Sequence, residues 1–167
     1  MNDKNPQHIK KTESDLQNLA PQVRGVVGDE ITMMLQQNEG NVAVVWSGVA
    51  APLVQESDKY NYVIPKEGSN LWFDNMVIPK TAQNKEGAYK FMNFLLDAKN
   101  NKQNTEWVGY ATPNKAARNM LPNDIKNDHR FYPNKKEQQR LEVYQDLGQD
   151  TLSEYNESFL NFKMSLK

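Results

Sequence analysis

Apolar residues recur at helical spacing in several parts of the chain, and the strongest case is an apolar stripe in the middle of the sequence. That stripe consists of Ala88, Phe91, Met92, Leu95 and Leu96. It predicts an amphipathic helix over residues 85–96, with Asn84 as its N-cap. Further helices are predicted over residues 6–19, after a capping Asp29, over 100–107 and over 116–121.

Three short apolar stretches have the character of β-strands. They are Val42-Ala43-Val44-Val45-Trp46, the alternating Tyr60, Tyr62 and Ile64, and Leu71 to Ile78. The first is an unbroken β-branched run, which is typical of a strand buried on both faces. Helices interleaved with such strands predict an α/β fold with at least partly parallel pairing. Three strands are few for a sheet of this class.

The last third of the chain combines a polar connection with a helical tail. Residues 122–135 read as an exposed connection, and residues 136–167 are helical in composition. The end of the tail carries a seam of apolar residues spaced alternately three and four apart: Leu152, Tyr155, Phe159, Phe162 and Leu166. A seam of this kind has to dock against another part of the molecule.

Composition narrows the class of protein. The 167 residues include 20 Lys and Arg against 21 Asp and Glu, and this balance argues against a dedicated nucleic-acid binder. Cysteine is absent, which excludes disulfides, Cys-ligated metals and a Cys nucleophile. Hydrophobic residues make up 38% and the mean hydropathy is −0.84, yet 10% aromatic residues leave enough material for a core.

The first residues, Met1 to Pro6, are polar and contain no apolar stretch of the kind found in signal peptides. A cytosolic protein would begin in this way, and so would a piece taken from the interior of a longer precursor.

Common catalytic and cofactor motifs are missing from the sequence. G-x-S-x-G, G-x-x-x-x-G-K and G-x-G-x-x-G do not occur, and neither His8 nor His129 has metal-ligand spacing. We interpret His129, in a polar turn, as a solvated loop histidine. None of the common sequence signals for catalysis, cofactor binding or metal binding is therefore present.

Aromatic residues beside polar ones at strand ends are the remaining candidates for a site. Trp72 and Asp74 are two residues apart on one predicted strand, so they are expected to face the same side. A Trp face attracts a cation and a carboxylate accepts its N–H groups, which together suit an amine. The alternative is that Trp72 is simply a core residue.

The order of several segments resembles the spermidine/putrescine-binding proteins of ABC transporters. The distinctive elements are Trp72-x-Asp74 followed by Ile78-Pro79, and then Gly109-Tyr110-x-Thr112-Pro113-Asn114. Supporting segments are Asn41–Gly48, Tyr62–Gly68, Asn84–Ala88 and Asn93–Leu96. The spacing holds from about residue 30 to 118, and more loosely through the tail.

The resemblance implies an α/β fold of the type II periplasmic-binding-protein class, with the ligand held in a cleft between two lobes. It assigns 1–70 to the second lobe, 71–118 to a segment that crosses to the first lobe, and 119–167 to the return. In such proteins aromatic rings sandwich the polyamine and carboxylates pair with its amines. The resemblance therefore also implies a binding protein with no enzyme activity, no cofactor and no metal. The resemblance then implies five ligand-binding residues: Trp46, Trp72, Asp74, Tyr110 and Gln145.

The resemblance covers only the C-terminal part of such a protein, so we expect this chain to be a truncated piece of an extracytoplasmic importer subunit. The whole protein would lie in the periplasm, or be lipid-anchored outside a Gram-positive cell, and would partner with permease subunits. Without most of its first lobe, the helix stripe would need another partner. We therefore expect self-association or domain swapping through Phe91, Met92 and Leu95.

Three other interpretations remain open. The chain could bind a different solute on the same fold, such as iron, sulfate, thiamine or a sugar. It could be a cytosolic α/β enzyme domain with a carboxylate pair, or an interaction module built on the tail seam. The sequence does not distinguish putrescine from spermidine, because chain length is read by groups at both ends of the cleft.

Overall fold

The computed structural model describes residues 2–166, which divide into two compact units. The terminal unit contains residues 2–44 and 142–166, and the central unit contains residues 45–141. These units do not coincide with the segments 1–70, 71–118 and 119–167 expected from the resemblance. Those segments concern lobes of a larger protein and stay a prediction.

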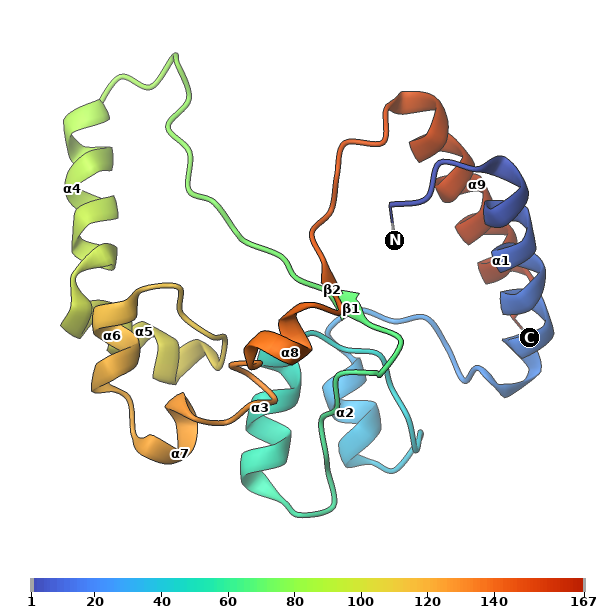
Figure 1. The fold of residues 1–167 in the computed structure, drawn as a ribbon, viewed down its shortest axis with the longest axis horizontal. Helices are drawn as coiled ribbons and strands as arrows, with labels where there is room; N and C mark the ends of the chain where they lie inside the picture. Colours follow the sequence, from blue (N-terminus) through green and yellow to red (C-terminus); the bar gives the residue numbers. More distant parts are fainter. Residues whose placement is uncertain (1, 167) are drawn as a thin grey trace. The chain divides into compact units, whose positions relative to one another are not determined.

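The terminal unit is built on two long helices that lie side by side (Figure 1). They are α1 (Pro6–Leu19) and α9 (Gln149–Met164), and the unit also holds η1 (Ala20–Gln22) and α2 (Ile31–Gln36). Ile9 and Phe162 are the buried residues of α1 and α9. Asn161 Nδ2 donates to Glu13 Oε1 across the pair at 3.0 Å.

The central unit carries the remaining helices among the described residues. They are α3 (Ser47–Glu56), α4 (Lys85–Leu96), α5 (Ala98–Val108), α6 (Lys115–Met120), α7 (Asn123–Lys126) and α8 (Lys135–Gln138). Asparagine and aspartate side chains begin several of them. Asn84 Oδ1 accepts from the Gly87 amide at 2.8 Å, Asp97 caps α5 and Asn114 caps α6. In the terminal unit Asn5 caps α1 in the same way, accepting from the Gln7 amide at 2.9 Å. These local signals explain why α1 and α4 occupy the ranges that the sequence predicts.

Two helix predictions need correction. Asp29 was expected to cap the second helix, but α2 begins after Glu30, which makes no side-chain cap. The tail was expected to be helical from residue 136, but α8 ends at Gln138 and α9 begins only at Gln149. The intervening segment includes Gly148, whose φ of 79° is incompatible with a continuous helix.

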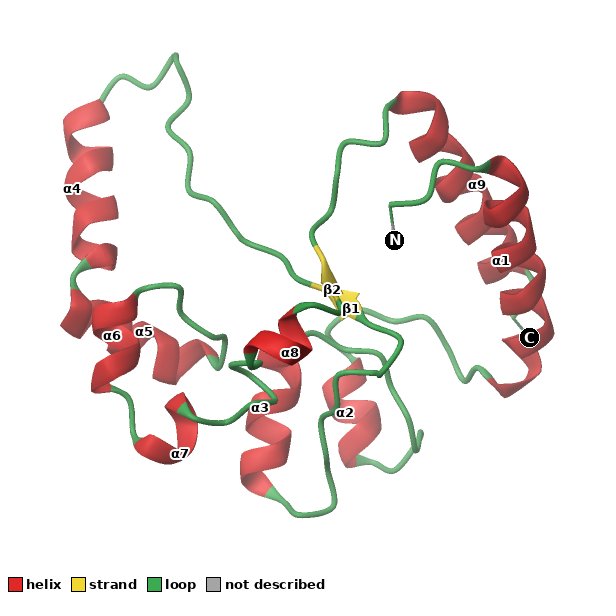
Figure 2. Cartoon of the chain, viewed as in Figure 1, coloured by secondary structure: helices red, strands yellow, loops and turns green. Residues whose placement is uncertain are grey.

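Among residues 2–166, paired strands are limited to β1 (Ser69–Asn70) and β2 (Leu141–Glu142). Long loops make up much of the remaining chain (Figure 2). Gly68 precedes β1 with a φ of 109°, and a Cβ at this position would overlap the carbonyl oxygen of Arg140. The Ser69 amide donates to that same oxygen at 3.4 Å.

The three predicted strands at 42–46, 60–64 and 71–78 are wrong for the described structure, where none of these segments forms a β-strand. A strand needs a neighbouring strand to accept and donate its backbone hydrogen bonds. The expected burial on both faces is also absent, since Val42 is 91% exposed and Val44 is 102% exposed. A β-branched composition therefore indicates that a segment is suited to a β-strand, but it does not show whether a neighbouring strand is present to pair with it.

Candidate functional site

Three of the five predicted site residues meet in one aromatic cluster within the central unit. Trp72 lies in the middle, with its ring centroid 5.4 Å from that of Trp46 and 5.4 Å from that of Tyr110. The ring planes meet at 70° and 76°, so both contacts are edge-to-face. The structure thus brings together side chains from three segments that are distant in sequence.

Trp46 is positioned by the start of α3. It occupies the N-cap, where its carbonyl accepts from the amides of Val49 and Ala50 at 3.0 and 3.1 Å. Its backbone is extended at this point, with φ −68° and ψ 148°, so the ring is placed just outside the helix. The side chain is 51% exposed, which leaves about half of its surface accessible to a ligand.

Tyr110 is positioned by the end of α5. Gly109 adopts the left-handed conformation with φ 75°, and its amide donates to the Thr105 carbonyl at 3.0 Å, which ends the helix. The ring of Tyr110 then lies directly against Gly48 in the first turn of α3. A Cβ built on Gly48 would overlap three atoms of that ring, so the absence of a side chain at Gly48 makes the approach possible.

Asp74 lies two residues beyond Trp72 in an extended, exposed segment that is not a strand. The expectation that Trp72 and Asp74 face the same side depended on the alternation of side chains along a regular strand, so it no longer has support. Within residues 2–166, the Asp74 carboxylate makes neither a hydrogen bond nor an ion pair. Its part in a site stays a prediction.

Gln145 belongs to the terminal unit, in the loop before α9 rather than on a tail helix. Its backbone amide donates to Asn2 Oδ1 at 3.0 Å, and the residue is exposed. The structure does not relate it to the aromatic cluster, so its role in ligand binding also stays a prediction.

A second group of aromatic residues in the central unit was missed by the sequence analysis. Phe131 stacks on Tyr62 with centroids 5.6 Å apart and planes at 6°, and burial raises the pKa of Tyr62. Both Phe131 and Tyr132 are half-buried, which corrects the expectation that residues 122–135 form an exposed connection. The run Phe131-Tyr132-Pro133 inside a polar stretch was the available signal.

A cavity of about 230 Å³ lies beside this group and against Tyr110. Its walls include residues of α3 and α5 together with Ile125, Phe131 and Tyr132. Trp46 and Trp72 do not line it. The cavity therefore lies beside Tyr110 and is not the space between the three clustered rings.

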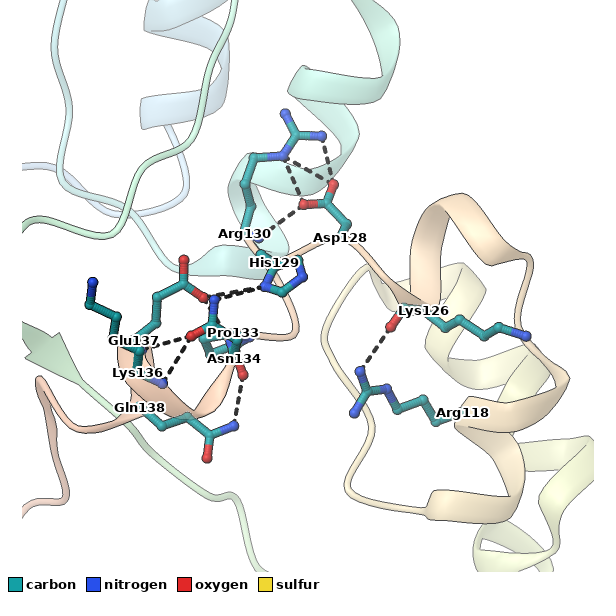
Figure 3. A network of polar contacts seen from close by, with 10 residues as sticks. All are labelled: Arg118, Lys126, Asp128, His129, Arg130, Pro133, Asn134, Lys136, Glu137 and Gln138. Atoms are coloured by element: carbon teal, nitrogen blue, oxygen red, sulfur yellow. Dashed lines mark hydrogen bonds and ion pairs between the residues drawn. The ribbon is translucent and has the colours of Figure 1, made fainter.

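The polar network of residues 126–138 is a surface feature (Figure 3). His129 Nδ1 lies 3.1 Å from Asn134 Nδ2 and 3.5 Å from Glu137 Oε2, and the ring is 60% exposed, as the sequence predicts. Arg130 holds the Asp128 carboxylate through its Nε and Nη2 atoms, and this hydrogen bonding lowers the pKa of Asp128. Asn134 and Glu137 cap α8 reciprocally.

Neither a metal site nor a membrane span is found in the described chain. Between residues 2 and 166, no three His, Cys, Asp or Glu side chains gather where they could hold an ion. None of the helices described there is both long enough and apolar enough to cross a bilayer. Independently of these findings, the cluster of Trp46, Trp72 and Tyr110 presents aromatic ring surface, whose chemistry suits contact with a cation or an alkyl chain.

Comparison with known proteins gives a consistent result. The sequence profile described as bacterial extracellular solute-binding protein matches residues 1–133. A spermidine/putrescine-binding periplasmic protein of Salmonella typhimurium is 35% identical over 162 residues, covering 97% of this chain and 46% of the relative.

Two solved structures share the fold. A putative spermidine/putrescine ABC transporter protein from Listeria monocytogenes has a TM-score of 0.91 and 53% identity, covering 98% of this chain and 50% of its own. The substrate-binding protein PotD of a spermidine/putrescine ABC transporter, from Streptococcus pneumoniae, has a TM-score of 0.85 and 42% identity. That comparison covers 99% of this chain and 51% of PotD.

These neighbours confirm the expected type II periplasmic-binding-protein-like fold in incomplete form. The chain spans about half the length of the relatives that it matches. This also supplies a physical reason for the unpaired β-branched segments: the relatives contain as much chain again, from which partner strands could come.

Proposed function

The chain belongs to the bacterial extracellular solute-binding proteins, and we propose that it supplies the C-terminal part of the polyamine-binding component of an ABC importer. The observation that carries this proposal is the contact of Trp46, Trp72 and Tyr110, which lie in the segments that resemble polyamine-binding proteins. Relatives named for spermidine and putrescine support the same ligand class.

The cluster suits the chemistry of a polyamine. Spermidine and putrescine are flexible polycations whose ammonium groups are strongly solvated, joined by short methylene chains. A site has to replace the lost water with ring faces and carboxylates, and has to offer apolar surface to the methylenes. The rings of Trp46 and Trp72 can serve both purposes, because their faces attract an ammonium group and also offer apolar surface to the methylenes.

The remaining two residues have polar roles in this proposal. The Asp74 carboxylate accepts N–H groups from one ammonium, and its exposure and lack of partners among residues 2–166 leave it available for this contact. The Gln145 side-chain oxygen would accept a hydrogen bond from an amine, a role that rests on the resemblance alone. An acidic partner for the far end of the ligand would come from outside this chain.

The affinity of this chain alone is expected to be weak. A ligand contacted on one side keeps much of its hydration shell but still loses translational and rotational freedom. In the whole protein, the part of the relatives that this chain does not cover would contribute further aromatic rings and carboxylates. The whole protein would work outside the cytoplasm, in the periplasm or attached to the outer face of the membrane, and would deliver its ligand to permease subunits.

The apolar face of α4 supports self-association of this chain. The structure places no buried residue on α4, and Phe91 is 59% exposed. Met92 and Leu95 lie on the same stripe, so a second copy could cover all three. Replacing Phe91 with Ser should lower the association constant, whereas the same change at Phe94, which is 58% exposed and lies farther from the stripe around the helix, should lower it much less. Sedimentation velocity over a range of concentrations measures the difference.

The test of the proposed ligand is calorimetric titration of this chain with spermidine and putrescine. Asp74→Asn should abolish or strongly weaken a saturable signal, because the counter-charge for one ammonium is lost. Asp58→Asn is the matched control, since Asp58 is an exposed carboxylate of the same unit that the resemblance does not assign to the site. Equal binding by wild type and Asp74→Asn would contradict the assigned role. Saturable binding of sulfate or a sugar in place of amines would contradict the ligand class.

A further inference from the structure

The loop that carries Tyr110 is held by one buried side chain, Thr112. This residue is 9% exposed, whereas the residues on either side of it are exposed. Its hydroxyl donates to Asn101 Oδ1 at 2.5 Å and accepts from the Asn114 amide at 3.0 Å. Both hydrogen-bonding functions of the hydroxyl are therefore used within the loop and its support.

The backbone of Thr112 has a second anchor. Its amide donates to the hydroxyl of Tyr132 at 3.2 Å. The guanidinium of Arg118 lies over the Tyr132 ring at 4.3 Å and also donates from Nη2 to the Lys126 carbonyl at 2.9 Å. The latter contact is drawn in Figure 3. Tyr132 is thus itself held in place before it holds the loop.

The same network reaches the C-terminal end of α4. Asn101 Nδ2 donates to the Leu95 carbonyl at 3.1 Å, and Asn114 Nδ2 donates to the Leu96 carbonyl at 2.8 Å. These carbonyls lack partners inside the helix, so the two asparagines satisfy them while also contacting Thr112. The amide orientation of Asn101 fits both of its bonds, with the oxygen facing Thr112 and the nitrogen facing α4.

We propose that Thr112 is a positioning residue that fixes the ring of Tyr110 against Trp72 and Gly48. Tyr110 lies in a segment without helix or strand hydrogen bonds, two residues before this anchor. A ring on a freely moving loop would be ordered only when ligand binds, which weakens binding; a ring held in advance avoids that loss. The inference rests on the proposed function only for the statement that Tyr110 contacts ligand.

The decisive variant is Thr112→Val, which keeps the shape of the side chain but removes the hydroxyl. Thr112→Ser keeps the hydroxyl and should rescue. Asn100→Ala is the matched control, because Asn100 Nδ2 donates to the Phe94 carbonyl at 3.0 Å at the same end of α4. Its side chain has no hydrogen bond to the loop in the described structure.

The readout is the near-ultraviolet circular dichroism of the ligand-free chain, with the Tyr110→Leu spectrum defining the contribution of that ring. Thr112→Val should lose more than half of this contribution, while Thr112→Ser and Asn100→Ala should keep it. A wild-type spectrum for Thr112→Val would overturn the proposal. So would an equal loss in Thr112→Ser, or in Asn100→Ala, because either result would indicate general loosening.

If Thr112→Val does not fold, as judged by far-ultraviolet dichroism, Tyr132→Phe replaces it. This variant removes only the hydroxyl that accepts from the Thr112 amide. Because Tyr132 has a near-ultraviolet signal of its own, the Tyr110 contribution is taken as the difference between the spectra of Tyr132→Phe and of the double variant Tyr132→Phe/Tyr110→Leu. This difference should be smaller than in the Tyr132 background, and an undiminished difference overturns the proposal. Titration with spermidine is a second, independent experiment. We expect the Kd for spermidine to rise roughly tenfold in Thr112→Val. A spectral loss with no change in binding for any variant, Tyr110→Leu included, would support the positioning role and refute the proposed ligand contact.

Discussion

The close approach of Tyr110 to Gly48 makes Gly48→Ala a sharp test of the aromatic cluster. In an ordinary helix, replacing Gly with Ala stabilises by up to about 1 kcal/mol because the unfolded chain has less freedom to lose. At Gly48 the added methyl would overlap three atoms of the Tyr110 ring, so the ring has to move.

The net effect follows from two opposing contributions. Overpacking of this kind costs about 1–3 kcal/mol. Subtracting the helix preference leaves a destabilisation of about 0–3 kcal/mol, and a value near zero would not by itself reveal the overlap. The interaction with Tyr110 is separated by a double-mutant cycle, in which Gly48→Ala is introduced both into the wild type and into Tyr110→Ala.

The cycle predicts a change of sign. Once the ring is absent, Gly48→Ala should stabilise the chain by up to about 1 kcal/mol, so the coupling between the two sites should be about 1–3 kcal/mol. Urea unfolding, followed by far-ultraviolet dichroism, measures all four proteins. Gly40→Ala is the control, since a Cβ there meets nothing within 4 Å. The same destabilisation by Gly48→Ala in both backgrounds would refute the packing of Tyr110 on α3.

Two further predictions concern parts of the chain outside the cluster. The pKa of Asp128 is lowered in the folded chain by hydrogen bonds from Arg130, so its contribution to stability is present above the unfolded pKa and is lost as the pH falls through the folded one. Asp128→Asn should therefore cost less than about 1 kcal/mol at pH 7 and less still at pH 2, as judged by urea unfolding; an equal cost at both values would contradict the assignment. Phe162 is the buried residue of α9, and Phe162→Ala should cost about 3 kcal/mol, whereas exposed Leu160→Ala should cost less than about 1 kcal/mol in the same assay.

Helices of this chain could be predicted because their signals are local. Pro6 and the Ile9 face identify α1, and Asn84 with its apolar stripe identifies α4, all within a few residues of the element itself. The cap of α2 was misplaced by one residue because Asp29 and the acidic Glu30 are adjacent, and composition alone does not choose between them.

Strands could not be predicted in the same way. The run from Val42 to Val45 has the composition of a buried strand, but pairing depends on chain that need not be near in sequence. In the described structure that run is not part of a strand, and Val42 and Val44 are exposed while Ala43 and Val45 are half-buried. The chain spans about half the length of its relatives, so the additional chain in those proteins is one source from which a partner strand could come.

The candidate site shows the same division. Trp46, Trp72 and Tyr110 were identified through the resemblance. That their rings contact one another, although they lie far apart in the sequence, could be learned only from the structure. The supports of Tyr110 were not foreseen. Tyr132 does not lie in a recognisable sequence motif. Its hydroxyl accepts from the Thr112 amide only because the chain folds back between residues 120 and 132.

The claim that the aromatic cluster binds polyamine is tested most directly by the indole N–H resonances of the three tryptophans. Trp46 and Trp72 belong to the cluster, whereas Trp107 is 89% exposed and lies outside it, so the chain contains its own reference. On titration with spermidine, the ¹⁵N-labelled chain should show saturable shifts at Trp46 and Trp72 with Trp107 unchanged. Equal shifts at all three, or none at millimolar spermidine, would contradict the account.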